Sequence, residues 1–528
     1  MALSLPDIDW NATLCQVPGF MVHPGLPIWA GAVVASAVLL GSGLALFSAP
    51  PTRVRAWHLE LARVPLIGAW IRWLTTSPWP LLALRFIVVG FFLMVIVAGL
   101  YGTPIPERNL ATALTWNLWW AGLIISVFFL GSAWCAVCPW DALATWLVRR
   151  RLWGRGNAGS SLNLRVPRAV RNVWPALALF VGLTWLELGV GVTTSPYATA
   201  SLALLMVVLA TVSLALFERK AFCRYFCPVG RTVGFYAQLA PVELRPVNTD
   251  TCARCTTLDC YHGNDAVEPC PTHLVMGRLT QNTYCTSCGN CAQSCPHQNV
   301  GWRLRPPSVE AVQEARPHWD EAWFMLGLLA LTGFHGVTMM PFWEGWIREL
   351  GRFIGDSGQL LWSFSIGLAV SLSLPILLYA LCVGMTHRLT RRAVPYKRLF
   401  AGLAFVALPL AFAYHLAHNL SHLVRESAGI GTLFTNPLGL GTQPLSEVER
   451  HLRHADMLIP QGALYGIQAA LMIFGFWIAL MVIRHRGRAL FPEGQALQRW
   501  SLLPMLVFVV VITAFHLGLL MQPMIMRM

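Results

Sequence analysis

Charged side chains are scarce in this sequence. Asp, Glu, Lys and Arg together make up 12% of its 528 residues, against about 25% in an ordinary soluble domain. The chain also lacks a glycine-rich dinucleotide loop, a Walker motif and a C-x-x-C-H motif, which are the usual marks of NAD(P)H, ATP and covalent haem binding. The scarcity of charged residues excludes an ordinary soluble enzyme. The missing motifs argue against NAD(P)H, ATP and covalent haem as direct ligands.

Long apolar runs take the place of charge. Hydrophobic residues make up 56% of the chain and the mean hydropathy is +0.56, and a membrane-spanning helix needs roughly 20 apolar residues. No Lys or Arg precedes the first run, so we do not expect it to be a cleaved signal peptide. We predict an all-α polytopic membrane protein with about ten spans, at residues 28–48, 82–101, 115–134, 173–191, 197–217, 322–340, 359–385, 399–421, 462–483 and 500–522.

Lys and Arg are distributed unevenly between the loops. The loops after the first, third, seventh and ninth spans carry 20 of them, whereas the two tails and the loops after the second, fourth, sixth and eighth spans carry 7. Basic loops face the cytoplasm. The sequence therefore predicts a bacterial inner-membrane protein with both termini in the periplasm. Its net charge of +14 then belongs to loops beside membrane lipid and does not indicate nucleic acid binding.

One polar insert separates the spans into two membrane domains. The predicted division is an N-terminal membrane domain at 1–217, a cytoplasmic insert at 218–321 and a C-terminal membrane domain at 322–528. Nine of the 14 cysteines lie within residues 227–295. Such crowding in a cytoplasmic segment is typical of metal ligation rather than of disulfides.

The insert contains a C-x2-C-x2-C-x3-C-P run, CTSCGNCAQSCP, at residues 285–296, and a looser copy upstream that ends in Cys270-Pro271. In two-cluster ferredoxins the fourth cysteine of such a run ligates the other cluster. Two structural zinc sites are the alternative, since four cysteines also suit zinc. We predict an α+β ferredoxin-like insert with two [4Fe-4S] clusters, one on Cys252, Cys255, Cys260 and Cys295, and the other on Cys270, Cys285, Cys288 and Cys291.

Two further cysteine pairs end spans on the predicted inner side of the membrane. Cys135 and Cys138 follow the third span, and Cys223 and Cys227 follow the fifth. Spacings of three and four place each pair on one face of a helical turn, and Arg224 and Arg231 nearby would favour thiolates. The four thiols are therefore predicted to hold a third iron–sulfur cluster or another metal, with a redox dithiol or inert buried cysteines as the alternatives.

The order of these motifs resembles the NosR/NapH/CcoG group of membrane-bound polyferredoxins. The resemblance covers about residues 80–300 and rests on the first span-end Cys-Pro, the second span-end CRYFCPVG and the eight-cysteine insert. It implies electron transfer in anaerobic respiration, or a role in maturing copper enzymes. The chain departs from the group in three ways: only two residues separate Cys135 from Cys138 where three are usual, no NosR-like flavin domain precedes the spans, and five further spans that the resemblance does not place follow the insert.

Those last five spans carry histidines and methionines. Three histidines of the eighth span fall on one helix face at 100° per residue, and ionisable groups inside spans are expensive and by default functional. Facing imidazoles hold haem, and His with Met suits copper. We expect b-type haem at His335, His415, His418, His422 and His516, and a metal contribution from Met521 and Met524. The alternatives for the histidines are copper binding, hydrogen-bonded packing within the protein, or contacts with a quinone.

These motifs predict an electron-transfer subunit of the oxidoreductase type, and they leave open whether it acts as an enzyme on a quinol. Electrons would pass between a quinone pool or a ferredoxin and a partner redox protein in a complex, through the cytoplasmic-side clusters and an outer-side haem. The alternative is a factor that reduces or delivers copper for a respiratory copper enzyme. Since the hydrocarbon core is about 30 Å thick, we expect an intermediate carrier between the two ends.

Overall fold

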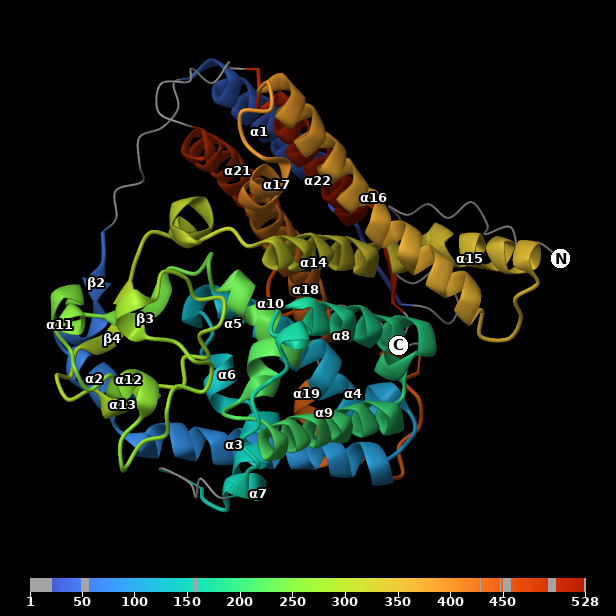
Figure 1. Cartoon of the computed structure of the whole chain (residues 1–528). Helices are drawn as coiled ribbons and strands as arrows, with labels where there is room; N and C mark the ends of the chain where they lie inside the picture. Colours follow the sequence, from blue (N-terminus) through green and yellow to red (C-terminus); the bar gives the residue numbers. More distant parts are fainter. Residues whose placement is uncertain are drawn as a thin grey trace.

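The structure, a computed structural model, describes residues 21–48, 57–152, 154, 160–427, 429–446, 448–449, 457–491 and 500–526. Within these ranges eight helices are long and apolar enough to cross a membrane, which confirms the prediction of a helical multi-pass protein (Figure 1). They are α1 (Ile28–Phe47), α3 (Pro78–Tyr101), the run Leu110–Leu130 that ends in α5 (Trp120–Leu130), α9 (Pro196–Leu216), α16 (Leu361–Leu389), the run Tyr396–Glu426 that ends in α18 (Ala407–Glu426), α21 (Gln461–Leu490) and α22 (Leu503–Met521).

The two other predicted spans are helical but irregular. The fourth is a shorter apolar helix, made of α8 (Trp174–Trp185) and a π-helix, η6 (Leu186–Val190). The sixth is α14 (Trp319–Thr338), which is followed at an angle of 93° by α15 (Pro341–Ile354). Proline at the first position of a helix fits the start of a new helix, so Pro341 explains why α15 begins here, and the apolar pattern alone does not predict the bend.

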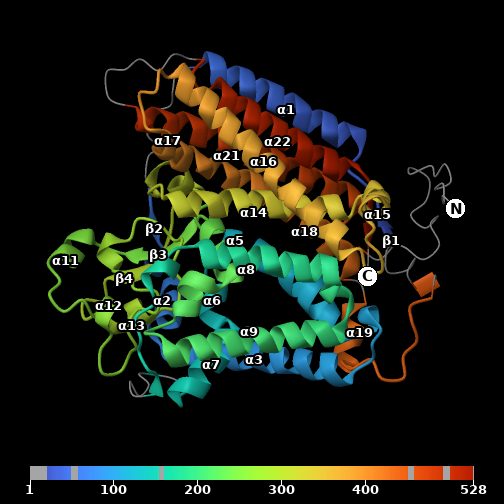
Figure 2. The same cartoon turned by 45° about the vertical axis from the view of Figure 1, so that its right-hand side comes forward.

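The run that ends in α18 lies at the centre of the molecule. Its most apolar stretch is wholly buried, whereas only 28%, 28% and 22% of the corresponding stretches of α1, α3 and α16 are buried. Helices α5, α14, α21 and α22 pack around α18 (Figure 2). A span that lipid does not touch can carry polar side chains more cheaply than its neighbours, and α18 is the span that carries three histidines.

The insert forms a small sheet with short helices beside it. Strands β3 (Val242–Pro246) and β4 (Val300–Leu304) pair antiparallel, with Val242 opposite Leu304, and the sheet order is β2-β4-β3. Strand β2 (Leu59–Glu60) comes from the loop after the first span. The short helices are α11 (Thr249–Ala253), α12 (Asp259–His262) and α13 (Asn290–Ser294). The sheet thus ties the insert to the N-terminal membrane domain.

A second, two-stranded sheet lies at the other end of the helices. Strand β1 (Met21–His23) pairs antiparallel with β5 (Met524–Met526), and His23 lies opposite Met524. Figure 2 places this pair and the C-terminal end far from the insert. Both described ends of the chain therefore share one face of the helical bundle, and the insert lies at the other.

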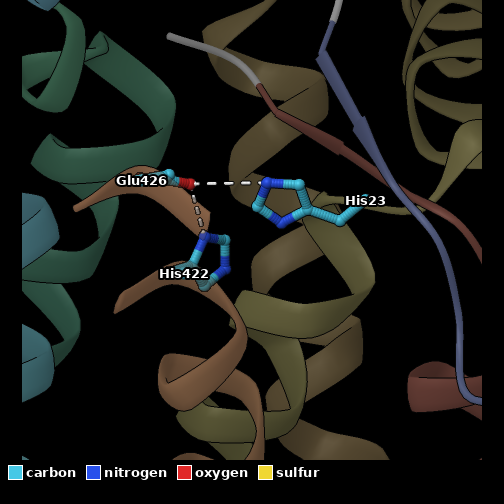
Figure 3. A group of neighbouring side chains, drawn as sticks. All are labelled: His23, His422 and Glu426. Carbon is cyan, nitrogen blue, oxygen red and sulfur yellow. Dashed lines mark hydrogen bonds and ion pairs between the residues drawn. The ribbon is translucent and has the colours of Figure 1, made fainter. Parts of the chain in front are cut away.

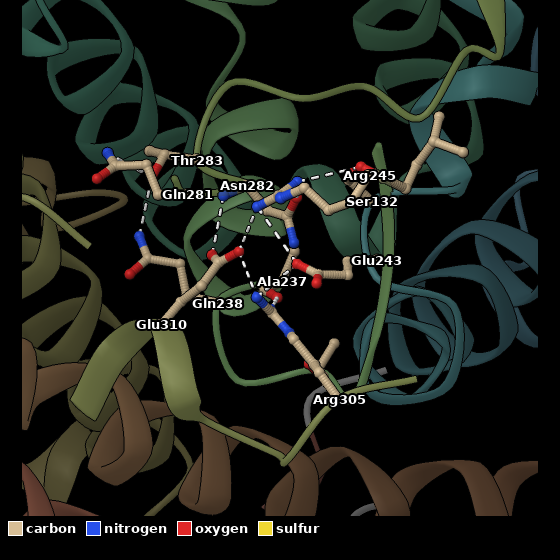
Figure 4. A network of polar contacts seen from close by, with 12 residues as sticks. Ser132, Ala237, Gln238, Glu243, Arg245, Gln281, Asn282, Thr283, Arg305 and Glu310 are labelled. Carbon is tan, nitrogen blue, oxygen red and sulfur yellow. Dashed lines mark hydrogen bonds and ion pairs between the residues drawn. The ribbon is translucent and has the colours of Figure 1, made fainter. Parts of the chain in front are cut away.

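A buried ionic network holds the strands and loops of the insert together (Figure 4). Glu310 accepts hydrogen bonds from Arg245 (2.6 Å), from Arg305 and from the backbone N–H of Asn282 (2.8 Å). Glu243 pairs with the same Arg305 at 2.8 Å. The Glu310 side chain is fully buried, and buried charges are tolerated only when they are paired and hydrogen-bonded.

We expect Glu310→Gln to destabilise the protein strongly. Removing one partner of a buried ion pair typically costs about 3–5 kcal/mol because the other charge stays buried, and here two guanidinium groups lose a shared carboxylate. The measurement is the apparent Tm in detergent. Glu344→Gln is the control, because Glu344 pairs with Arg348 on the exposed surface of α15, where a pair is worth about 0–1 kcal/mol. Equal Tm values for the two variants would contradict the role of the network.

Candidate functional site

The eight insert cysteines fall into two groups in space. The Cys260 thiol lies within electrostatic reach of Cys252, Cys255 and Cys295, and the Cys291 thiol lies within reach of Cys270, Cys285 and Cys288. The grouping follows the ligand sets that the motif spacing predicts. Within the part of the chain that the structure describes, all these cysteines are free of disulfides.

Backbone N–H groups point at several of these sulfurs. The N–H groups of Leu274, Ser287 and Asn299 donate to the Sγ atoms of Cys270 (3.3 Å), Cys285 (3.4 Å) and Cys295 (3.4 Å). Hydrogen bonds to the sulfurs are one of the ways in which a protein tunes an iron–sulfur cluster. Four thiols per group with N–H donors around them form a donor set that fits a [4Fe-4S] cluster.

The span-end cysteines also come together, though not as helical-turn pairs. Cys135 lies in the four-residue helix α6 (Trp134–Val137), and Cys138 caps α7 (Pro139–Arg149). Cys223 lies in a π-helix, η8 (Phe222–Phe226), and Cys227 caps α10 (Pro228–Tyr236). The expectation of one regular helical turn per pair is wrong because, in both motifs, the proline after the second cysteine starts a new helix.

Burial dominates the acid–base properties of these four thiols. It raises the pKa of Cys135 to about 12, with the neighbouring Cys227 adding to the rise and the Arg231 guanidinium opposing it. Burial likewise raises the pKa of Cys223 well above its usual range, where Asp141 adds to the rise. Arg231 therefore favours thiolate as the sequence suggests, but it does not overcome burial. A metal centre deprotonates a coordinating thiol outright, so bound iron would offset this penalty.

The arginines beside Cys223 and Cys227 also hold the insert in place. Arg231 donates to the carbonyl oxygens of Cys223 (2.9 Å) and Thr283 (2.6 Å), and Arg224 donates to the carbonyl oxygen of Thr272. The side chains of Ser132 and Ser287 share a hydrogen bond of 2.8 Å. These contacts attach the loops that carry Cys270 and Cys285 directly to the span-end motifs.

The three cysteine groups consequently form a row. Cys260 of the first insert group is an electrostatic neighbour of Cys291 of the second. Cys285 of the second is a neighbour of Cys135 in the span-end group. The second insert group therefore lies between the first insert group and the membrane.

The span-end region is also where the chain is similar to known proteins. A family model described as a 4Fe-4S binding domain matches residues 112–157 and 199–240. The matched residues contain all four span-end cysteines. This similarity supports 4Fe-4S binding by the chain, and it falls on the span-end cysteines and not on the eight cysteines from Cys252 to Cys295.

The chain is also similar to part of a bacterial protein. The chain is 30% identical over 143 residues to the putative electron transport protein YccM of Escherichia coli (strain K12). The matching region is 26% of this chain and 38% of that protein, so the chain spans well under half of the relative's length. No solved structure matches the chain.

A large apolar cavity adjoins the span-end cysteines. Its volume is about 540 Å³, within the range of small-molecule sites. Its wall includes Trp134, Pro139 and Val229, which lie next or nearly next in sequence to Cys135, Cys138 and Cys227. Glu187 is the one acidic residue among its lining residues. The wall also includes Trp116, Trp119, Trp120 and Trp140.

Aromatic rings connect this region with α18. The Trp119 ring lies 5.7 Å from Trp134 and 6.0 Å from Trp120, and Trp120 lies 5.8 Å from His415, measured between ring centroids. The Tyr236 hydroxyl, at the end of α10, is hydrogen-bonded to Nδ1 of His415 at 3.2 Å. His415 is therefore in contact with α10, which begins after Cys227, and with α5, which ends shortly before Cys135.

The predicted histidines form a row along α18 rather than a single outer group. His418 contacts both His335 and His422, with ring centroids 5.2 and 4.7 Å apart, and the two Nε2 atoms of His418 and His422 are 3.1 Å apart. His415 and His422 are seven positions apart, which corresponds to about 10 Å along the helix. His516 lies to one side, stacked on the Tyr414 ring at 4.3 Å.

Sequence reasoning missed two members of this region. His23, on β1, and Glu426, at the end of α18, are both buried beside His422. Nothing in the local sequence links residue 23 with residue 422, because the β1–β5 pairing that positions His23 joins the two ends of the chain. Of the predicted methionines, Met524 is buried opposite His23, whereas the Met521 thioether lies against Gly31 of α1.

Proposed function

We propose that this protein carries electrons along three [4Fe-4S] clusters, held by the two insert groups and the span-end group. The observation that carries the proposal is the row of cysteine groups, in which a thiol of each group lies within electrostatic range of a thiol of the following group. A bound cluster supplies reversible one-electron chemistry. The chain's own residues fix the spacing of the groups, supply N–H donors to the sulfurs and exclude water from the span-end group.

The Trp-lined cavity is the place where we propose that a membrane quinone exchanges electrons with this row. Its wall is apolar and shares residues with the loops of Cys135, Cys138 and Cys227. Oxidation of a quinol releases two protons and two electrons. The electrons would pass to the span-end group one at a time, and the Glu187 carboxylate would relay the protons. Glu187 lies on a π-helix, a feature frequent at functional sites.

Replacing Glu187 by Gln is expected to lower the rate of quinol-driven cluster reduction by about a hundredfold, since a positioned acid–base group contributes roughly 10²–10⁴ in rate. The measurement is bleaching of the iron–sulfur absorption after anaerobic mixing with a water-soluble quinol. Dithionite should reduce the variant fully, which shows that its clusters are intact. A wild-type quinol rate in Glu187→Gln would remove the proposed proton relay.

The other end of the row points to a soluble partner. Cys255 is flanked by exposed residues, Arg254 and Thr256 among them, so the first insert group lies closest to the aqueous phase. We propose that a partner redox protein or a ferredoxin exchanges electrons there, on the cytoplasmic side that the Lys and Arg distribution predicts. The protein would act as a subunit of a larger complex in the inner membrane.

The histidine row on α18 is the proposed cofactor site at the outer end, with haem or a metal ion as its occupant. A role in copper reduction or delivery is the second candidate function, because Met524 lies opposite His23 in the β1–β5 pair and thioether with imidazole suits copper. Quinol-driven reduction of the clusters without any copper requirement would favour electron transfer. Quinol oxidation that needs added copper would favour the second candidate.

A further inference from the structure

A compact cluster of His23, His422 and Glu426 lies at the outer end of the histidine row (Figure 3). The Glu426 Oε1 atom is 2.9 Å from Nδ1 of His422 and 3.9 Å from Nε2 of His23. One ligand atom from each of the three residues lies within 4.8 Å of the other two. All three side chains are buried, with 1% to 9% of their surface exposed.

These separations suit a shared metal ion. Imidazole nitrogens and carboxylate oxygens lie about 2.0–2.2 Å from zinc and similar ions, which places two neighbouring ligand atoms about 3.3 Å apart. The observed 2.9 and 3.9 Å bracket that distance. Two histidines and one carboxylate are also a set that binds first-row transition metals and leaves positions open.

The hydrogen bonding of His422 fits metal ligation through Nδ1. Its Nε2 atom faces Nε2 of His418 at 3.1 Å. A metal-bound histidine typically donates its other ring N–H to an acceptor, which fixes the ring's tautomer and orientation. In the tautomer in which the His422 Nε2–H donates to His418, the His422 Nδ1 lone pair faces the Glu426 carboxylate, and a cation bound by both atoms removes the repulsion.

The same contacts disfavour haem at His422. Ligation through Nδ1 and a hydrogen bond through Nε2 use both ring nitrogens. The His335–His418 and His418–His422 rings are in direct contact, so neither pair has a haem plane between its two rings.

Met524 lies on the same side of the β1–β5 pair as His23. The two residues are opposite each other in the strand register, and opposite residues of an antiparallel pair project from the same face.

We propose that His23, His422 and Glu426 bind a redox-active first-row transition-metal ion, with His418 as a positioning residue that orients His422. The inference rests on the proposed electron-transfer function, for which this ion is the outer-end cofactor. His23 brings the ligand set together only because β1 and β5 pair, so the two ends of the chain complete the site.

The test uses Cu(II) as the probe on the full-length protein in detergent, after removal of loosely bound metal with a chelator. We expect one Cu(II) per chain with an electron paramagnetic resonance spectrum that shows nitrogen ligands, and no pyridine-haem signal that depends on His422. Glu426→Gln and His23→Gln should each weaken Cu(II) binding at least about a hundredfold. His418→Gln should weaken it about 10–100-fold, the usual effect of losing the partner of a metal-bound histidine.

The control is His387→Gln. His387 lies in the last turn of α16, outside the cluster, so this variant should bind Cu(II) like the wild type. Unchanged Cu(II) affinity and nitrogen coupling in both Glu426→Gln and His23→Gln would overturn the site, as would a haem signal that His422→Gln abolishes. Retained iron–sulfur absorption shows that a variant has folded. Quinol reduction of the clusters is measured on the same samples. If the protein binds Cu(II) but quinol does not reduce the clusters, the proposed function is wrong. If quinol reduces the clusters but the protein does not bind Cu(II), the proposed metal site is wrong.

Discussion

Cys223→Ser is expected to lose about a third of the cluster iron, one [4Fe-4S] cluster of three, and all quinol-driven reduction of the remaining two. Cys223 belongs to the span-end group, whose loops share the wall of the Trp-lined cavity. The insert clusters have their own ligands in other loops and should stay bound. Iron analysis and the absorption spectrum measure the first effect, and anaerobic mixing with quinol measures the second.

Cys382→Ser is the matched control for that variant. Cys382 is also a buried cysteine in a helix, α16, but it lies outside all three groups and should keep the full iron content and quinol rate. Wild-type iron in Cys223→Ser would mean that the span-end thiols hold no cluster. Loss of iron with quinol reduction of the insert clusters intact would place the quinone elsewhere.

Much of the fold could be predicted from composition alone. Apolar runs of about 20 residues have few ways to satisfy their backbone groups in lipid other than as helices, and all ten predicted segments are helical. The 93° turn between α14 and α15 and the shortness of α8 could not be predicted, because hydropathy fixes which residues avoid water and not the direction of a helix after a proline.

The cysteine sites were predictable to different degrees. Spacing alone suggested the two insert groups, because a short loop forces its thiols together. That the span-end group is next to Cys285 depends on tertiary contacts such as the one between Ser132 and Ser287. The cavity was unpredictable for a similar reason: its wall combines side chains as distant in sequence as Phe91, Glu187 and Phe434.

The position of α18 links the two proposed cofactor regions. This helix is buried on all sides. Its row of polar side chains runs from His415, which contacts Tyr236 of α10, to Glu426, which lies beside His23 of the β1–β5 pair. The tryptophans and Tyr236 fill the interval between the span-end group and His415. A single electron jump across the membrane is thus unnecessary if both regions are redox-active.

The order of the three cysteine groups leads to a prediction that depends on where the row is interrupted. Cys288 belongs to the middle group, and Cys255 to the group farthest from the membrane. In Cys255→Ser, quinol should still reduce both remaining clusters. In Cys288→Ser, two clusters also remain, but quinol should reduce only the span-end one, because the other has lost its neighbour.

The two variants thus serve as controls for each other, since each removes one insert cluster and about a third of the iron. Dithionite should reduce every remaining cluster in both, which separates a missing connection from a missing cluster. Low-temperature electron paramagnetic resonance after quinol addition counts the reduced clusters. If the first insert group in Cys288→Ser is reduced at the wild-type rate, electrons reach it by a route outside the row. If it is reduced only by dithionite, the middle group is the obligatory link, as expected from the electrostatic proximity of Cys135 to Cys285 and of Cys291 to Cys260.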